Sequence, residues 1–181
     1  MSIRLYILGI LAISNDHPYQ IKKKLVRALP NSQFSEGKFY YNFEALQKKG
    51  HIEAVEVVQE GKRPDKTLYA ITTDGRKALE QGIYDSFKNT VILRELYISI
   101  YLLQFVDRQK VATILEDTIT KEKQRLQQVK ERNQNNEKFL EGYVKLNEQT
   151  KQSLDFIYDH SFNNADFNIS WLEKLLEFVK K

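Results

Sequence analysis

The first part of the chain carries short apolar segments separated by turn residues. Residues 3–13 are almost entirely apolar and follow Ser2, a favourable N-cap, which predicts a buried helix. Residues 18–29 place apolar side chains at helical spacing behind Asp16, the expected cap. Pro18 falls in the first turn, where its missing N–H does no harm. Two short helices are therefore expected at the start of the chain.

A third helix is predicted over residues 36–49, because Ser35 is a favourable N-cap and Gly50 is a typical residue after a helix. Its buried stripe has the spacing i, i+4, i+7 and consists of Phe39, Phe43 and Leu46. The opposite face is expected to be exposed and carries Lys38, Tyr41, Asn42 and Ala45.

A β-hairpin should follow the third helix. Residues 52–58 alternate β-branched and acidic side chains, and residues 67–71 form a second segment with strand character. The turn between them, residues 61–65, has a basic tip, and another helix is expected from Thr73 or Asp74. Three helices followed by a hairpin is the element order of a winged helix-turn-helix, and the caps, glycines and periodicities agree with it.

Long helices dominate the pattern after residue 82. Residues 91–106 are apolar on most sides, which predicts a helix enclosed by the rest of the molecule. A long helix should begin near Arg108, with Asp107 as its cap. Its later positions form either a weak heptad seam or a solvated helix whose middle leaves the core, and both interpretations stay open. These positions are Leu126, Val129, Asn133, Asn136, Leu140 and Tyr143.

The last predicted helix covers residues 149–179 and is amphipathic. Because so short a chain offers its long helices few internal partners, we expect a homodimer, partly of coiled-coil character. The predicted fold is mainly α with a small β-hairpin: a winged helix-turn-helix over residues 1–82 and a helical dimerisation domain over residues 83–181. The residues expected at the dimer interface are Leu154, Ile157, Tyr158, Trp171, Leu172, Leu175, Leu176 and Val179.

Composition narrows the classes of protein. The chain has 181 residues, of which 41% are hydrophobic and 29% charged, a balance that argues against disorder. It has no Cys, so a disulfide framework, a thiolate nucleophile and a cysteine-based zinc site are excluded. The apolar start lacks a small-residue cleavage site, and no segment reaches the roughly 20 apolar residues of a membrane span. We therefore expect a cytoplasmic protein.

The net charge of +4 is unevenly distributed. Residues 1–82 contain 13 Lys and Arg against 9 Asp and Glu, whereas residues 83–181 are balanced. Clustered Lys and Arg favour a polyanionic partner, because they release counterions from nucleic acid phosphates. The first half is therefore the expected DNA-binding half, although a charge of this size is also ordinary for a small domain.

Several of these segments resemble one known family. Residues 35–52 read SEGKFYYNFEALQKKGHI and are similar to the signature S-x-G-x-[LF]-Y-x-x-[LF]-x-x-L-x-x-x-G-x-I of the PadR-type transcriptional regulators. Residues 8–11 and 17–21 resemble the family's first two helices, and residues 61–75 resemble its wing and the start of its fourth helix. The resemblance is specific over about residues 7–79 and, beyond them, extends only to a layout of long helices.

The resemblance implies a homodimer whose paired winged helices bind a two-fold DNA operator and usually repress transcription. It also implies that Tyr40 and the basic wing residues contact the DNA backbone. Three positions depart from the family pattern: Pro18 replaces a common glycine, Lys38 stands where a small Thr is usual, and Ala45 stands where a basic residue often lies. The preference for a DNA sequence therefore does not transfer.

Physical reasoning points to the same surfaces. On the exposed face of the third helix, Lys38, Tyr41 and Asn42 have donors suited to base edges in the major groove, and Asn can pair with adenine. At the hairpin tip, Lys62, Arg63 and Lys66 suit phosphates or a narrow minor groove. For each of these residues, a plain solvated side chain is the alternative.

Other functions leave weaker signals. Three histidines, no Cys, no G-x-S-x-G elbow and no phosphate-binding glycine loop argue against an enzyme, and no cofactor or metal is expected. The rival class is a winged helix that binds protein, or a helical scaffold without specific DNA binding. The family often binds a small planar or hydrophobic effector, and the second half is rich in aromatic residues. Because aromatic side chains at helical spacing are more often core, no effector-binding residue is named.

Overall fold

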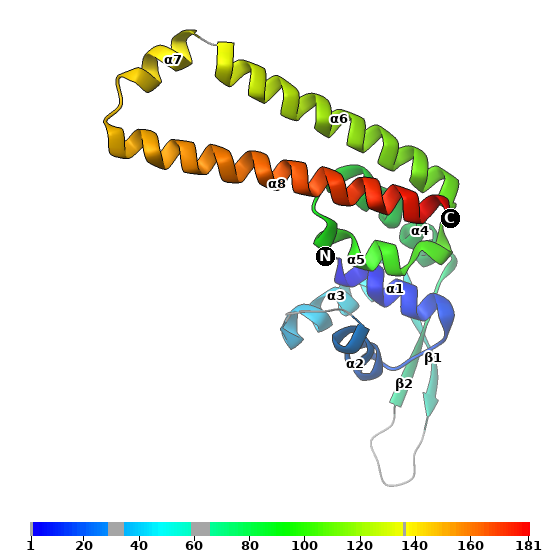
Figure 1. Ribbon diagram of the computed structural model, residues 1–181. Helices are drawn as coiled ribbons and strands as arrows, with labels where there is room; N and C mark the ends of the chain where they lie inside the picture. Colours follow the sequence, from blue (N-terminus) through cyan, green and yellow to red (C-terminus); the bar gives the residue numbers. More distant parts are fainter. Residues whose placement is uncertain (1, 29–34, 59–65, 136) are drawn as a thin grey trace. The chain divides into compact units, whose positions relative to one another are not determined.

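The computed structural model describes residues 2–28, 35–58, 66–135 and 137–181 (Figure 1). The chain forms two compact units. The first comprises residues 1–90 and 94–107, and the second comprises residues 91–93 and 108–181. In the described part of the chain, no helix is both long enough and apolar enough to cross a membrane.

The first unit has the predicted order of three helices, a hairpin and a fourth helix (Figure 1). It extends beyond residue 82, the predicted end of the first domain, because the end of the fourth helix and the segment after it pack within the same unit. Its elements are α1 (Ile3–Ile13), α2 (Pro18–Ala28), α3 (Glu36–Lys48), β1 (Ile52–Val58), β2 (Lys66–Ile71), α4 (Thr73–Asn89), α5 (Leu93–Tyr101) and a 3₁₀ turn, η1 (Leu103–Phe105).

Local capping explains where these helices begin. The predicted caps are confirmed for α1 and α3: Ser2 Oγ accepts the Leu5 N–H at 3.4 Å, and Ser35 Oγ accepts the Lys38 N–H at 3.3 Å. In α4, Thr72 Oγ1 accepts the Gly75 N–H at 3.0 Å, so the helix begins at Thr73. Each cap satisfies a backbone donor that the first helical turn leaves open.

The start of α2 differs from the prediction. His17, not Asp16, accepts the first helical N–H, because His17 Nδ1 lies 3.2 Å from the Tyr19 nitrogen. Pro18 is the first residue of α2 and has no N–H, so the capping position moves to the residue directly before it. Asp16 instead accepts the His17 N–H at 2.8 Å and pairs with Lys24 at 2.7 Å.

The core of the first unit lies around α1, which contacts α2, α3, α4 and β2. Tyr6 is 1% exposed, and burial raises the pKa of its phenol, with Tyr101 adding to the effect. Two glycines permit this close packing. A Cβ on Gly9 would lie 2.3 Å from Leu102 Cδ2, and a Cβ on Gly82 would lie 2.5 Å from Leu5 Cδ2.

The junction of α3, the hairpin and α4 is fixed by backbone contacts. Gly50 ends α3 with a φ of 69°, a left-handed conformation that favours glycine. The Thr72 N–H donates to the His51 carbonyl at 3.0 Å, and the Thr72 hydroxyl donates to the Gly50 carbonyl at 2.7 Å. A Cβ on Gly75 would lie 2.0 Å from the His51 carbonyl oxygen, so only glycine fits at the first turn of α4.

The hairpin is antiparallel, with Ile52 opposite Ile71 and a bulge between Ala54 and Glu56. The segment before α2 joins it through Asp16, which exchanges two backbone hydrogen bonds with Tyr69. The Tyr69 ring in turn packs edge-on against Phe43 of α3, with ring centroids 4.8 Å apart. The hairpin is therefore tied to α3 as well as to the segment that leads into α2.

The apolar segment predicted as one helix over residues 91–106 is divided. Helix α5 ends at Tyr101, and the chain tightens into η1. The exit of this turn is held by the Asp107 N–H, which donates to the Tyr84 hydroxyl at 3.0 Å. Leu96 and Leu102 are fully buried, whereas Tyr101 is 46% exposed, so the segment is enclosed on one side only.

The second unit contains three helices: α6 (Arg108–Asn135), α7 (Glu137–Val144) and α8 (Glu148–Lys180). Helices α6 and α8 run antiparallel and lie side by side (Figure 1). Among the described side chains, three ion pairs join them, Lys180–Glu116 at 2.5 Å, Lys123–Glu173 at 2.6 Å and Lys130–Asp166 at 3.4 Å. Successive pairs are seven residues apart on both helices, which is the period of a coiled-coil seam. The bounds of α6 and α8 confirm the predicted long helix from Arg108 and the predicted last helix.

Burial along this hairpin is uneven. The buried residues of α8 all lie from Ile169 onward, and those of α6 lie before residue 120. Toward α7, Val129 is 41% exposed and Val144 is 70% exposed. Of the predicted heptad positions, Asn136 and the side chains of Asn133 and Leu140 lie outside the described residues.

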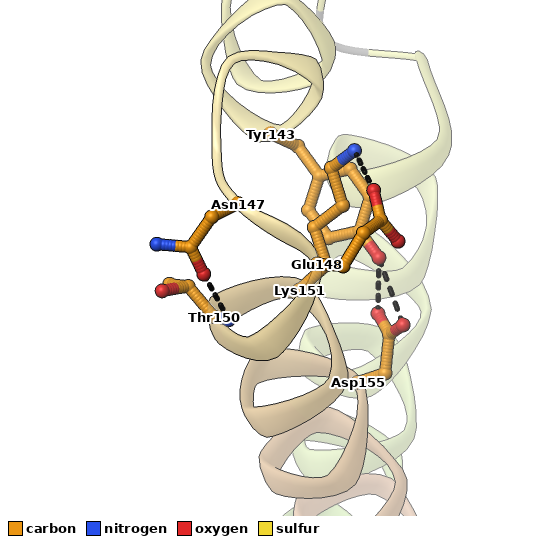
Figure 2. Close-up of polar contacts among 6 residues, drawn as sticks. All are labelled: Tyr143, Asn147, Glu148, Thr150, Lys151 and Asp155. Atoms are coloured by element: carbon orange, nitrogen blue, oxygen red, sulfur yellow. Dashed lines mark hydrogen bonds and ion pairs between the residues drawn. The ribbon is translucent and has the colours of Figure 1, made fainter.

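The turn between α7 and α8 is held by polar contacts (Figure 2). The Tyr143 hydroxyl donates to the Asp155 carboxylate at 2.7 Å, and this hydrogen bond raises the pKa of the Tyr143 phenol. The Asn147 side chain caps α8 by accepting the Thr150 N–H at 2.8 Å. Lys151 pairs with Glu148 at 2.8 Å and lies 6.0 Å from the centre of the Tyr143 ring. The reversal of direction therefore has its own local network.

Candidate nucleic-acid interface

The buried stripe predicted for α3 is confirmed, whereas two of the four side chains predicted to be exposed, Asn42 and Ala45, are half-buried. Phe39, Phe43 and Leu46 are between 0% and 4% exposed and anchor the helix in the core. On the other side, Lys38 is exposed and Tyr41 is 68% exposed. An ammonium and a phenol on an anchored helix are suitable groups for phosphates and base edges.

Asn42, one turn beyond Lys38, is engaged within the protein. Its Oδ1 accepts from Arg4 Nε on α1 at 2.8 Å, and its Nδ2 donates to the Lys38 carbonyl at 2.7 Å. The side chain is half-buried. In this conformation, Asn42 joins α3 to α1 with both of its polar atoms, whereas Lys38 and Tyr41 keep open positions on the surface.

Tyr40 lies beside the buried stripe. It is half-buried, and its ring meets Phe39 edge-on with ring centroids 5.4 Å apart. Lys22 of α2 places its ammonium 5.8 Å from the centre of the Tyr40 ring and 5.6 Å from that of Tyr19. Lys22 also pairs with Glu36 at 2.5 Å, and this hydrogen bond raises the pKa of the lysine. The signature tyrosine is therefore part of a contact between α2 and α3.

The predicted wing residues are only partly described. Lys62 and Arg63 lie outside the described residues. Lys66 begins β2 opposite Val58, and its side chain also lies outside the description. Their part in binding DNA therefore stays a prediction.

Two residues of this surface, Arg4 and Lys22, were not singled out by sequence reasoning. Arg4 is the only charged residue in the otherwise apolar α1, which is a signal that could have found it. Lys22 belongs to a run of three lysines, and nothing in the sequence separates it from Lys23 and Lys24. Their partners, Asn42 and Glu36, are distant in sequence, so the spacing of residues does not indicate them.

The predicted dimerisation residues fall into two sets. Leu172, Leu175 and Val179 are at most 6% exposed, so they stabilise the single chain. Leu154, Tyr158 and Leu176 are half-buried, whereas Ile157 is 54% exposed and Trp171 is 37% exposed. The surface available to a partner is therefore narrower than the predicted set.

Exposed aromatic residues extend this surface beyond the prediction. Phe156, Phe167 and Phe178 are 76%, 60% and 49% exposed. At about 100° per residue, these three and Trp171 lie within about 60° of one another around α8. We call them the aromatic stripe of α8. Lys174 lies 4.3 Å from the centre of the Trp171 ring, and Arg108 of α6 lies 5.9 Å from that of Phe178, so positive charges border the stripe.

Three helices, a two-stranded hairpin and a further helix define the first unit as a winged helix-turn-helix domain. Residues 7–81 match the family model described as "Transcriptional regulator PadR-like family". The match covers the segment that carries the recognition-helix signature, so the resemblance to this family is confirmed over these residues. None of the curated protein sequences matches the chain.

Solved structures with similar chains include a transcriptional regulator of Thermoplasma acidophilum. It is 28% identical over 42% of this chain and 72% of that chain, with a TM-score of 0.38. Bacillus subtilis PadR in complex with operator DNA is 17% identical over 97% of this chain and 98% of that chain, with a TM-score of 0.37. The same protein in complex with p-coumaric acid is 16% identical over 99% of both chains, with a TM-score of 0.36. The operator DNA and the p-coumaric acid are ligands of the Bacillus subtilis protein.

Proposed function

We propose that this protein is a DNA-binding transcription regulator that acts as a homodimer on a two-fold operator in the cytoplasm and represses transcription. The observation that carries the proposal is the exposed face of α3, anchored by three aromatic and aliphatic side chains within a segment of the PadR-like family. A surplus of positive charge in the same half of the chain supports a polyanionic partner.

The proposed DNA surface consists of two parts. On α3, Lys38 and Tyr41 enter the major groove, and Tyr40 contacts the backbone at its edge. On the β-hairpin, Lys62, Arg63 and Lys66 contact phosphates. Asn42 is half-buried and supports this surface through its hydrogen bond with Arg4.

The proposed dimer uses the aromatic stripe of α8 together with Ile157. Exposed aromatic residues concentrated on one helix face are unusual for a surface that meets only water. The single chain already buries Leu172, Leu175 and Val179 of α8, so a second copy would cover the aromatic side chains that remain exposed. Two copies related by a two-fold axis also match the symmetry of an operator.

A small-molecule effector is part of the proposal. The winged-helix unit contains a cavity of about 430 Å³ whose lining includes Arg4, Lys38, Asn42 and Ser86. A ligand in this cavity would contact the side chains that connect α1 with α3. Its binding would therefore change the position of the proposed DNA-reading helix.

The first experiment is selection of genomic DNA fragments by the purified full-length protein, followed by titration of a recovered site and a scrambled duplex at several salt concentrations. Tighter binding to the recovered site, with affinity that falls steeply as salt rises, supports the proposal. Equal and weak binding to both duplexes, with little dependence on salt, would instead favour the protein-binding winged helix.

The second experiment is sedimentation of the wild type and of a Phe167→Ala/Trp171→Ala variant. We expect a dimer for the wild type at micromolar concentration and a shift toward monomer for the variant. Ile13→Ala is the matched control, since Ile13 is 58% exposed and belongs to α1 rather than to α8. A monomeric wild type would contradict the proposed assembly.

A further inference from the structure

Lys22 has an unusually ordered environment for a lysine near the surface. Its Nζ lies 2.5 Å from Glu36 Oε1 and between the rings of Tyr19 and Tyr40, at 5.6 and 5.8 Å from their centres. The Lys22 side chain is 21% exposed, whereas its partner Glu36 is 65% exposed. Lys22 is therefore the more buried member of the ion pair, and Glu36 is the more exposed one.

Each contact restricts the ammonium without using all of its capacity. The aliphatic stem packs against the protein, and the two aromatic faces attract the charge. An ammonium has three N–H donors, and the hydrogen bond to Glu36 uses one of them. A phosphate can therefore approach a cation whose position is already restricted and compete with Glu36 for it at low entropic cost.

The cluster lies at the start of α3, the helix that carries the proposed DNA surface. Glu36 is the first residue of α3, and Lys38 and Tyr40 follow within its first two turns. Contacts between a protein and DNA phosphates position such a helix without reading the sequence. The anion expected at this place is therefore a phosphate of the DNA backbone.

We propose that Lys22 is a DNA-phosphate-binding residue and that Glu36 is its built-in competitor. In the free protein, the Lys22 ammonium pairs with the Glu36 carboxylate. In the complex with DNA, a backbone phosphate replaces this carboxylate as the partner of Lys22. This inference rests on the proposed DNA-binding function, which does not itself assign either residue.

Glu36 consequently lowers the affinity for all duplexes. An exposed ion pair is weak, so a phosphate displaces it readily, but the released carboxylate repels the DNA and takes up a cation from solution. The competition weakens phosphate-driven binding without affecting any contact to a base edge. The share of the binding free energy that depends on sequence rises accordingly.

The test uses Glu36→Gln in the full-length protein, with Glu44→Gln as the matched control. Glu44 is an exposed glutamate on the same helix, so both variants remove one negative charge from α3. The probe is a mixed-sequence duplex long enough for two half-sites, titrated at several salt concentrations. We expect Glu36→Gln to bind up to about five-fold more tightly per half-site than Glu44→Gln, with a salt slope steeper by up to about one unit.

The same pair of substitutions in a Lys22→Gln background shows whether Glu36 acts through Lys22. We expect Lys22→Gln to weaken binding, and the advantage of Glu36→Gln over Glu44→Gln to disappear. Thermal melting confirms that all variants are folded. A local weakening of α3 cannot imitate the main result, because it would lower affinity rather than raise it.

Three outcomes would overturn the inference while leaving DNA binding intact. They are equal affinities for Glu36→Gln and Glu44→Gln, weaker binding by Glu36→Gln, and an unchanged advantage in the Lys22→Gln background. If the wild-type protein bound no duplex even at low salt, the proposed function would fail, and this inference with it.

Discussion

The winged-helix unit and the α6–α8 hairpin are stabilised by contacts of different kinds. In the winged-helix unit, helix starts have side-chain caps, and the junction at Gly75 leaves no room for a Cβ. In the hairpin, three ion pairs repeat every seven residues, and burial decreases from the base toward α7. The starts of α1, α3 and α4 are specified by their own capping residues, whereas the α6–α8 hairpin is specified by a repeat.

This difference indicates where a second copy of the chain contributes. The core of the winged-helix unit encloses α1 almost completely, so its fold depends on the single chain. The α6–α8 hairpin leaves the aromatic stripe of α8 exposed, so part of its apolar surface is accessible to a second copy. Substitutions in the first unit should therefore act on folding, and those on the stripe should act on assembly.

The largest effect is expected inside the hairpin. Leu172 is 0% exposed, so Leu172→Ala leaves a cavity and should lower the free energy of unfolding by roughly 2–5 kcal/mol. Phe167→Ala, on the exposed face of the same helix, should change the stability of the single chain by less than about 1 kcal/mol. Chemical denaturation at a concentration where the protein is monomeric distinguishes the two. Equal losses would show that the two faces of α8 are not different in kind.

A comparable effect is expected at the backbone junction of the winged-helix unit. Gly75→Ala places a methyl group against the His51 carbonyl and should cost about 1–3 kcal/mol or more. Gly37→Ala is the control, since Gly37 lies within α3 with open space around it, and the change should be neutral or stabilise by about 0.5–1 kcal/mol. Thermal melting of both variants measures the contrast. A stable Gly75→Ala variant would mean that the junction has room to move.

A smaller effect is expected where α1 meets α3. Arg4→Met leaves Asn42 Oδ1 without its charged donor and should cost about 1–2 kcal/mol, and Asn42→Ala should cost about as much. The double variant should lose less than the sum of the two, because both substitutions remove the same hydrogen bond. Arg94→Met, at an exposed position on α5, is the control. Strict additivity in a double-mutant cycle would argue that the hydrogen bond contributes nothing.

The same variants bear on DNA recognition. If Asn42 acts by holding α3 in place, Asn42→Ala should lower the affinity for the operator and for a scrambled duplex to a similar degree. If its side chain turns to a base on binding, the loss should be roughly 1–3 kcal/mol on the operator and much less on scrambled DNA. The structure favours the first outcome, since both polar atoms of the side chain already have partners.

The smallest effect is expected from one interhelical ion pair. Lys123→Glu and Glu173→Lys each place like charges opposite one another and should each cost about 0.2–1 kcal/mol. The double exchange restores opposite charges and should recover most of the loss, and added salt should reduce all three differences. Melting temperatures at low and high salt test this. A double variant no better than either single one would show that the repeat does not stabilise the hairpin.

Sequence reasoning succeeded where order is local. The starts of α1 and α3 follow from Ser2 and Ser35, because a cap acts within one turn of its helix. The burial of Phe39, Phe43 and Leu46 follows from helical spacing. The predicted cap of α2, Asp16, is one residue away from the observed cap, His17, because Pro18 has no N–H and shifts the capping position.

Sequence reasoning was weaker where contacts join distant positions. The contacts of Asn42 with Arg4 and of Glu36 with Lys22 depend on how α1, α2 and α3 pack, which no spacing within one helix reveals. The exit from η1 is held by a hydrogen bond from the Asp107 N–H to Tyr84, a residue of another helix. On α8, amphipathicity predicted an apolar face, but it did not say which of its side chains are buried within one chain.

The three ion pairs of the hairpin differ in polarity, and this difference selects one alignment of α6 and α8. The lysine belongs to α6 in the pairs of Lys123 and Lys130, whereas it belongs to α8 in the pair of Glu116. A slip of seven residues would keep the heptad spacing, but it would bring Glu116 opposite Glu173 in one direction or Lys123 opposite Lys180 in the other. The charges thus select a single register for the two antiparallel helices, because only this alignment leaves every pair attractive.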